Sequence, residues 1–231
     1  MMLLLAFGRC LPYMTRAMKS GDWSARNYPG VRRIAGRTLG LVGFGASSQA
    51  VAERARPFGL KLLAWTRSPE KYLAVSERLG VELRELDDLL RESDFVSLHL
   101  PFNPETTHLL DQRRLSLMKP GAVLINTARG AFVDEEALVT ALKENRLGGA
   151  ALDVFEGIDV FALPKDPRDP PQHELLRLDN VILTPHCAGS SVESTLDCER
   201  RGAASVADVL GGKWPRHVVN PQVQPRFPLV Q

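Results

Sequence analysis

The segment Gly43–Ser48 has the glycine spacing of a loop that binds a dinucleotide. It follows the apolar run Leu39–Val42 and precedes a helical stretch. Gly43 permits a tight turn, Gly45 lets the backbone approach a diphosphate, and Ser48 is the small third residue needed where helix packs on strand. The start of the helix would offer free N–H groups and the positive end of its dipole to phosphate. We therefore expect cofactor binding by Gly43, Gly45, Ala46, Ser47 and Ser48; the alternative is a glycine turn that only joins strand to helix.

The residues at the end of the second apolar run indicate which dinucleotide the loop would bind. Thr66 lies 21 residues after Gly45, where NAD-binding loops place an Asp or Glu on the ribose 2′-hydroxyl. That carboxylate is missing, and Arg67 and Ser68 stand beside the position. Guanidinium and hydroxyl groups can bind a 2′-phosphate, which a carboxylate would repel. Thr66, Arg67 and Ser68 therefore favour NADPH over NADH, the alternative being that Arg67 is a solvated surface residue.

Short apolar runs alternate with helical stretches from Thr38 onward. The runs are 39–42, 62–65, 95–98, 122–125, 150–154 and 181–183. The helical stretches between them include 49–58, 86–92, 111–118 and 135–145. Continuous apolar strands separated by helices are typical of a parallel sheet covered on both faces. The fold class predicted is α/β, a doubly wound parallel sheet of the Rossmann type.

The two ends of the chain have a different pattern. Residues 2–18 carry apolar side chains at helical spacing and predict one leading helix, followed by a polar link over 20–37. A last long helix is expected over 192–210, with Ser190 and Glu193 as a capping box and Gly211-Gly212 as its stop. The Pro-rich stretches 157–174 and 214–231 predict irregular structure.

Composition and charge exclude several classes of protein. The chain has 231 residues, of which 44% are hydrophobic and 24% charged, an ordinary globular balance. A net charge of +2 gives no reason to expect a nucleic-acid partner, and no apolar run reaches the roughly 20 residues of a membrane span. Its three cysteines are widely spaced, which predicts a reduced, cytoplasmic protein without a structural metal.

Four motifs further along the chain indicate a family. They are Val96–Pro101 with Glu105-Thr106-Thr107, Ile125–Gly130 with Val133-Asp134-Glu135, Ala151–Glu156, and Leu183–His186 followed by Ala188-Gly189. In this order they resemble the D-isomer-specific 2-hydroxyacid dehydrogenases, and the resemblance spans nearly the whole chain. It implies hydride transfer between a nicotinamide coenzyme, NADP or NAD, and a small 2-keto or 2-hydroxy acid.

The resemblance also assigns roles to single residues. Arg129, in Thr-Ala-Arg-Gly, corresponds to the arginine that binds the substrate carboxylate and polarises the carbonyl. His186, in Thr-Pro-His, corresponds to the proton donor of the reduction. Asp153 matches the position at the nicotinamide end of the coenzyme. The remaining cofactor-lining positions, besides Arg129 and His186 themselves, are Leu100, Pro101, Thr127, Ala128, Ala188 and Gly189. His99 and His108 are interpreted as ordinary polar groups near strand ends.

The sequence departs from the family pattern at an acidic position. The family has a Glu five residues after the aspartate, where it supports the charged form of the histidine. Counting from Asp153 gives Ile158, which cannot do so. We therefore expect a weaker enzyme with an acid-shifted optimum, unless Glu156 or Asp159 takes this role.

The other departure concerns domain organisation. We expect an NAD(P)-binding domain over residues 1–190 with a leading dimerisation helix, then a returning helix and tail over 191–231. The substrate domain that precedes this region in the family is expected to be absent. Because the leading helix would expose apolar surface, and because the family dimerises here, a homodimer is predicted. The alternatives are a catalytically weak dinucleotide-binding dimerisation module, like the family's co-repressor relatives, and an NADH-dependent phosphoglycerate dehydrogenase.

Overall fold

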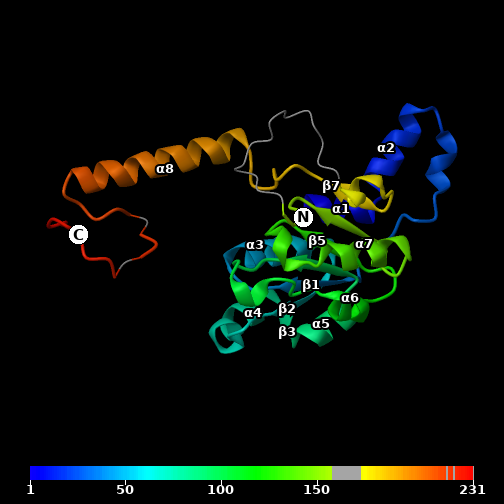
Figure 1. The fold of residues 1–231 in the computed structure, drawn as a ribbon, viewed down its shortest axis with the longest axis horizontal. Helices are drawn as coiled ribbons and strands as arrows, with labels where there is room; N and C mark the ends of the chain where they lie inside the picture. Colours follow the sequence, from blue (N-terminus) through cyan, green and yellow to red (C-terminus); the bar gives the residue numbers. More distant parts are fainter. Residues whose placement is uncertain (158–172, 217, 221, 231) are drawn as a thin grey trace. The chain divides into compact units, whose positions relative to one another are not determined.

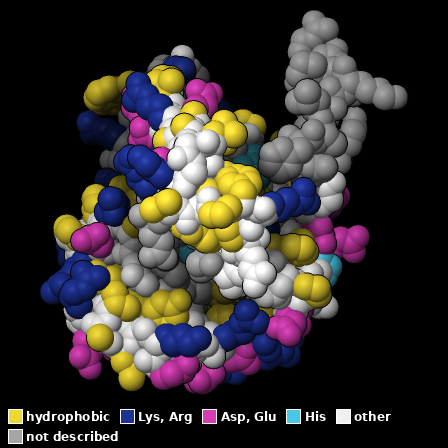
Figure 2. All heavy atoms as spheres, turned by 90° about the vertical axis from the view of Figure 1, so that its left-hand side faces the viewer, with side chains coloured by type: hydrophobic (Ala, Val, Ile, Leu, Met, Phe, Trp, Pro, Cys, Tyr) yellow, Lys and Arg dark blue, Asp and Glu magenta, His cyan; other side chains and the backbone are white. Residues whose placement is uncertain are grey.

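The structure is a computed structural model that describes residues 1–157, 173–216, 218–220 and 222–230. The chain divides into two compact units, Met1–His186 and Cys187–Gln231. Within the described ranges, no helix is both long and apolar enough to cross a membrane. On the face seen in Figure 2, cationic and anionic side chains lie interspersed, in keeping with the nearly balanced composition.

A single parallel sheet of seven strands organises the first unit (Figure 1). Its order is β3-β2-β1-β4-β5-β6-β7, and every neighbouring pair is parallel. The strands are β1 Thr38–Val42, β2 Lys61–Trp65, β3 Val81–Leu83, β4 Phe95–Leu98, β5 Val123–Asn126, β6 Gly149–Leu152 and β7 Val181–Leu183. The predicted doubly wound α/β fold is confirmed, since the chain runs outward from β1 in both directions.

Helices cover both faces of this sheet, which is why the strands are apolar on both sides. One hydrophobic cluster packs strand residues against side chains of α5 Leu86–Glu92, α6 Gln112–Leu117 and α7 Glu135–Lys143. The other cluster, on the opposite face, includes side chains of α1 Met2–Gly8, α3 Ala46–Ala55 and α4 Leu73–Leu79. Gly40 of β1 lets α5 approach closely, because a Cβ there would lie 2.5 Å from Leu89 Cδ2.

The leading segment differs from the prediction of one helix over 2–18. It forms α1 and α2 (Leu11–Lys19), separated by Arg9 and Cys10. Cys10 has a left-handed φ of 51°, and Pro12 occupies the first turn of α2. Because proline has no N–H and its ring clashes with the preceding turn, the helix stops and begins again around it. The short 3₁₀ helix η1, Trp23–Asn27, follows α2.

Some other boundaries also differ. The structure adds β3 and α4, which the apolar pattern did not predict, and starts α3 at Ala46 instead of residue 49. In the second unit, α8 spans Val192–Leu210 as predicted, and none of its residues is buried. Its capping box is formed by Ser191 and Ser194, so the predicted Ser190–Glu193 box is wrong by one residue. The two serines are three residues apart, the spacing at which each hydroxyl can accept the backbone N–H of the other residue.

Candidate functional site

The predicted site residues of the first unit all follow carboxyl ends of strands. Residues 43–48 follow β1, residues 66–68 follow β2, and Leu100 and Pro101 lie beyond β4. Residues 127–129 follow β5, Asp153 follows β6, and His186 follows β7. In a parallel sheet these ends share one edge, and ligands bind there where the strand order reverses. Here the reversal is at β1, which lies between β2 and β4.

The glycine loop after β1 begins with a backbone conformation that favours glycine. Gly43 has φ +95°, its N–H donates to Trp65 O at 2.9 Å, and a Cβ there would lie 2.6 Å from His99 O. Gly45 is different, since its φ of −74° suits any residue. A Cβ on Gly45 would meet no atom of the described ranges within 4 Å. Open space therefore lies beside the backbone where a diphosphate would approach.

The first turn of α3 fits an anion. Gly45 is its N-cap and has no side chain that could accept from the first N–H groups of the helix, which therefore remain available to an anion at this cap. Ser47 Oγ lies 3.2 Å from His99 Nδ1. Ser48 is fully buried, and its Oγ has no hydrogen-bond partner among the residues that the structure describes. Ser48 thus has the packing role expected at the third position, and the glycine cradle fits a dinucleotide.

His99 connects this loop to β4. Its Nε2 lies 2.9 Å from Ser97 Oγ, and its Nδ1 faces Ser47. Burial lowers the pKa of His99 to about 4, so the ring is neutral at pH 7. A neutral imidazole can donate from one ring nitrogen and accept at the other, which lets it join the two hydroxyls. His99 is therefore a structural partner of the loop.

The expected 2′-position lies between the ends of β2 and β4. Arg67 Nη1 lies 2.8 Å from Glu105 Oε2. Thr66 Oγ1 accepts a long, 3.5 Å hydrogen bond from the N–H of Ser68. Leu100 borders the glycine loop, since its Cδ2 would lie 2.9 Å from a Cβ on Gly43. Pro101 is exposed beyond it.

The turn after β5 presents Arg129. Asn126, which is buried, donates from Nδ2 to Arg129 O at 2.8 Å and accepts at Oδ1 from the N–H of Ala128 at 3.0 Å. These two bonds fix the turn that contains Thr127. Arg129 itself is exposed, and its Nη1 donates to Ala128 O at 2.6 Å. The guanidinium is therefore exposed at the strand edge, and its planar group has further N–H donors that a ligand could use.

A hydrogen bond between two side chains joins the ends of β6 and β7. Asp153 is buried, and its Oδ1 accepts a 2.5 Å hydrogen bond from Thr184 Oγ1. Two residues later, His186 has a left-handed φ of 53°, and its N–H donates to Thr184 O at 3.0 Å. Non-glycine residues adopt this conformation at a cost of about 1–3 kcal/mol, and such residues cluster at functional sites. The histidine is half-buried next to the aspartate–threonine contact.

A buried glutamate holds the segment after β6 in place. Glu135 Oε1 accepts the N–H of Glu156 at 2.7 Å, and its Oε2 lies 2.5 Å from His173 Nε2. Burial raises the pKa of Glu135 above its ordinary value. The Glu156 side chain contacts His108 Nε2, and this hydrogen bond raises the pKa of His108. Glu156, one of the acids expected to support His186, thus faces His108 in this structure.

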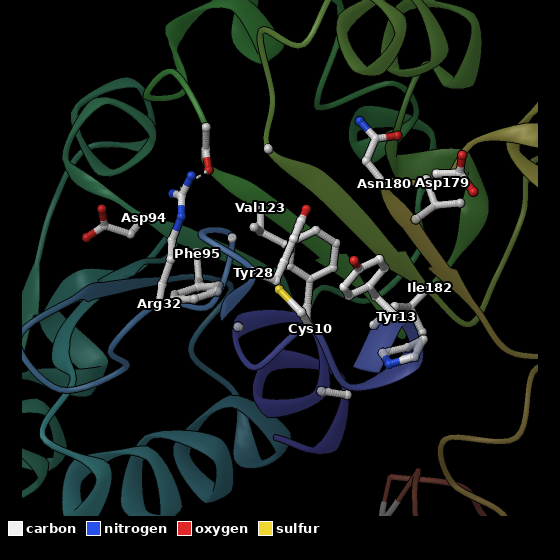
Figure 3. A pocket seen from close by; sticks show the side chains of 18 of the residues that line it. Cys10, Tyr13, Tyr28, Arg32, Asp94, Phe95, Val123, Asp179, Asn180 and Ile182 are labelled. Carbon is white, nitrogen blue, oxygen red and sulfur yellow. Dashed lines mark hydrogen bonds between the residues drawn. The ribbon is translucent and has the colours of Figure 1, made fainter. Parts of the chain in front are cut away.

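The opposite edge of the sheet contains a cavity of about 320 Å³ (Figure 3). It lies between the leading segment and the amino ends of the strands, lined by Cys10, Tyr28, Arg32, Phe95 and Ile182 among others. None of the predicted site residues lines it. The cavity is therefore separate from the edge that carries the glycine loop, Arg129 and His186.

Comparison with known proteins places these features in a family. The family described as D-isomer specific 2-hydroxyacid dehydrogenase, NAD binding domain, matches residues 1–188. This chain belongs to that family. It is 41% identical over 230 residues to a glyoxylate reductase of Thermococcus onnurineus, a match covering 96% of this chain. It is 38% identical over 219 residues, 94% of this chain, to a D-3-phosphoglycerate dehydrogenase of Methanocaldococcus jannaschii.

A solved relative shares the fold. An acyclic imino acid reductase (Bsp5), in complex with NADPH and D-Arg, has a TM-score of 0.76 at 32% identity; the match covers 90% of this chain and 62% of that one. The glyoxylate reductase is matched over 64% of its length and the phosphoglycerate dehydrogenase over 39%. This chain therefore spans less than two thirds of the length of these relatives.

Some positions named in the sequence analysis lie outside the described residues or in the second unit. Ile158 and Asp159 lie outside the described residues. Ala188 and Gly189 belong to the second unit. Gly189 O accepts a 2.9 Å hydrogen bond from Ser194 Oγ at the start of α8.

Four contacts of the site were not predicted: those made by His99, Glu105, Thr184 and Glu135. His99 directly follows a buried strand next to β1, and that position alone could have indicated contact with the glycine loop. The contact of Glu105 with Arg67 spans 38 residues and that of Thr184 with Asp153 spans 31. No local spacing indicates such pairs.

Proposed function

We propose that this chain forms the coenzyme half of an NADPH-dependent reductase of small 2-keto acids, with Arg129 and His186 as its catalytic residues. The observation that carries the proposal is their placement. Both follow strands of one parallel sheet, on the edge where the glycine loop presents open backbone after β1. Family membership supports the reaction class, and the glyoxylate reductase relatives support a small 2-keto acid such as glyoxylate or hydroxypyruvate.

The side chains of Arg129 and His186 suit the two requirements of the reaction, which are binding of the substrate carboxylate and protonation of the carbonyl oxygen. The planar fork of Arg129 can donate two parallel hydrogen bonds to a carboxylate and polarise the neighbouring carbonyl. His186 can give a proton to the carbonyl oxygen as negative charge develops on it. A bound reduced nicotinamide would supply the hydride that the carbonyl carbon receives. Hydride and proton together convert the keto acid to the hydroxy acid, and oxidation is the reverse.

The coenzyme positions divide by role. Gly43, Gly45, Ala46, Ser47 and Ser48 form the diphosphate loop, and Thr66, Arg67 and Ser68 form the 2′-phosphate site. Lining positions toward the nicotinamide are Leu100, Pro101, Thr127, Ala128, Arg129, Asp153, His186, Ala188 and Gly189. NADPH is favoured because the 2′-position offers Arg67, and a relative binds NADPH.

Oligomeric state and location complete the proposal. The leading segment leaves Leu11 56%, Met18 49% and Trp23 64% exposed, and such apolar surface is typical of an interface. We propose a homodimer through this segment of a domain spanning residues 1–190, with 191–231 as returning helix and tail. Sedimentation velocity should show a dimer that Met18→Glu with Trp23→Glu dissociates. The widely spaced cysteines support a cytoplasmic location.

The activity test is direct. Purified chain is mixed with NADPH and glyoxylate or hydroxypyruvate, and the loss of reduced-nicotinamide absorbance is followed, with NADH in a parallel series. Turnover that His186→Gln and Arg129→Gln abolish supports the proposal. Activity restricted to NADH and phosphorylated hydroxy acids would instead indicate phosphoglycerate dehydrogenase.

One observation favours a second function, a dinucleotide-binding module with little activity. Glu156 faces His108, so in this structure it does not support His186. Binding of NADPH without turnover of several 2-keto acids would establish the module. A shift in the pH profile on Asp159→Asn would show that Asp159 supplies the acid.

A further inference from the structure

The pair formed by Arg67 and Glu105 joins the ends of two strands at the expected 2′-position. Arg67 follows β2, and Glu105 lies in the 3₁₀ helix Pro104–Thr106 beyond β4. Their charged atoms are 2.8 Å apart although the residues are 38 positions apart in sequence. The side chains are 56% and 77% exposed, so a ligand can reach both.

The backbone that carries Glu105 is fixed. Asn103 Oδ1 accepts the N–H of Thr106 at 3.1 Å, and Thr106 Oγ1 accepts the N–H of Asn103 at 3.0 Å. Pro104 restricts the first turn, and Thr106 is buried. Glu105 is held between these residues, so its carboxylate is presented toward Arg67 from a defined position.

This carboxylate changes what Arg67 can bind. A 2′-phosphate must compete with Glu105 for the guanidinium and is repelled by the carboxylate itself. A ribose with a free 2′-hydroxyl suffers no repulsion and can donate a hydrogen bond to a carboxylate. Asp or Glu has this function in NAD-binding loops but is missing at the end of β2 here. Glu105 brings a carboxylate to Arg67 from the segment beyond β4, on the other side of β1.

We propose that Glu105 is a specificity-determining residue that acts through Arg67: it weakens the preference for NADPH and lets the site accept NADH as well. The inference rests on the proposed coenzyme function. Glu105 sets the ratio of the two affinities and contributes little to folding, since exposed ion pairs stabilise proteins only slightly.

Calorimetric titration of the whole chain with NADPH and with NADH tests this. The variants are Glu105→Gln and, as a control of equal charge change, Glu144→Gln, which breaks the exposed 2.8 Å pair with Arg146. We expect Glu105→Gln to raise the ratio Kd(NADH)/Kd(NADPH) about tenfold, or about 1.4 kcal/mol, and Glu144→Gln to leave it within twofold. An unchanged or lower ratio in Glu105→Gln overturns the inference.

The route through Arg67 has its own test. In an Arg67→Ala background only the direct action of the carboxylate on the 2′-group remains, so Glu105→Gln should change the ratio less than it does in the wild type, and persistence of the full effect would overturn the role of the pair. Urea midpoints of all variants should match the wild type, which separates binding from folding. If neither coenzyme binds the wild type, the proposed function fails and this inference with it. If both bind at an unaltered ratio, only the role of Glu105 is lost.

Discussion

Two turns at the same sheet edge are built in opposite ways. The turn after β1 is made of backbone: Gly43 is buried with a positive φ, and its surroundings leave no room for a side chain. In the turn after β5, the buried side chain of Asn126 fixes the backbone by two hydrogen bonds, and the side chain of Arg129 is exposed to solvent. The backbone conformation at Gly43 is thus tied to folding, whereas an exposed side chain such as that of Arg129 is nearly independent of it. Substitution of Gly43 should affect stability, and substitution of Arg129 should affect activity alone.

The largest effect is expected at the second turn. Arg129→Lys keeps the charge but loses the planar fork, so kcat/KM for 2-keto acid reduction should fall about 10³-fold. The urea midpoint should not change, because the side chain is exposed. Steady-state kinetics and denaturation on the same preparations check this, with Arg146→Lys, at a half-buried arginine away from the sheet edge, as a control. A loss below tenfold, or an equal loss in the control, would show that the guanidinium does not act on the substrate.

At the first turn, Gly43→Ala should lower the free energy of unfolding. It places a side chain at φ +95° and a Cβ 2.6 Å from a carbonyl oxygen, and we expect a loss of about 3 kcal/mol in the free energy of unfolding. Gly36→Ala is the matched control: its φ is +83°, but nothing lies within 4 Å of the added Cβ. The control should lose about 1 kcal/mol. Equal losses would mean that the close approach to His99 is unimportant.

His99 should make the first turn sensitive to acid. Its pKa is about 4 when folded against an unfolded value of 6.5, so below pH 6.5 the unfolded chain takes up a proton that the folded chain does not. The contribution of His99 to the free energy of unfolding is complete above pH 6.5. It is lost as the pH falls to 4, by about 2 kcal/mol after allowing for partial exposure. Urea denaturation across this range should show the loss, and His99→Gln should remove it. A pH dependence that the substitution leaves intact would assign the effect to other groups.

The smallest effect separates the two serines of the first turn. The buried Ser48 hydroxyl has no hydrogen-bond partner within the described part of the chain, so Ser48→Ala should raise the free energy of unfolding by about 1 kcal/mol. Ser47→Ala removes a contact with His99 and should not stabilise. Thermal denaturation compares the two. Destabilisation by Ser48→Ala would mean that its hydroxyl is hydrogen-bonded in solution.

The sequence predicted the fold well wherever the signal was local. Six of the strands were predicted because their residues are apolar on both faces, whereas β3 has three residues with a glutamate in the middle and shows no such run. The break at Cys10 depends on Pro12, whose effect the apolar spacing concealed. For the site, the motif residues were found at strand ends. The partners of Arg67 and Asp153 come from distant segments, and only the order of strands in the sheet brings them together.

Calorimetry with NADPH on the wild type and Gly45→Ala tests the central claim, that backbone after β1 holds the coenzyme diphosphate. The added methyl meets no atom within 4 Å and the φ of −74° suits alanine, so the protein should still fold. We predict that the wild type binds one NADPH per chain and that the variant binds at least about tenfold more weakly with little change in melting temperature. Equal affinity in the two proteins, or no heat of binding in the folded wild type, would contradict the account.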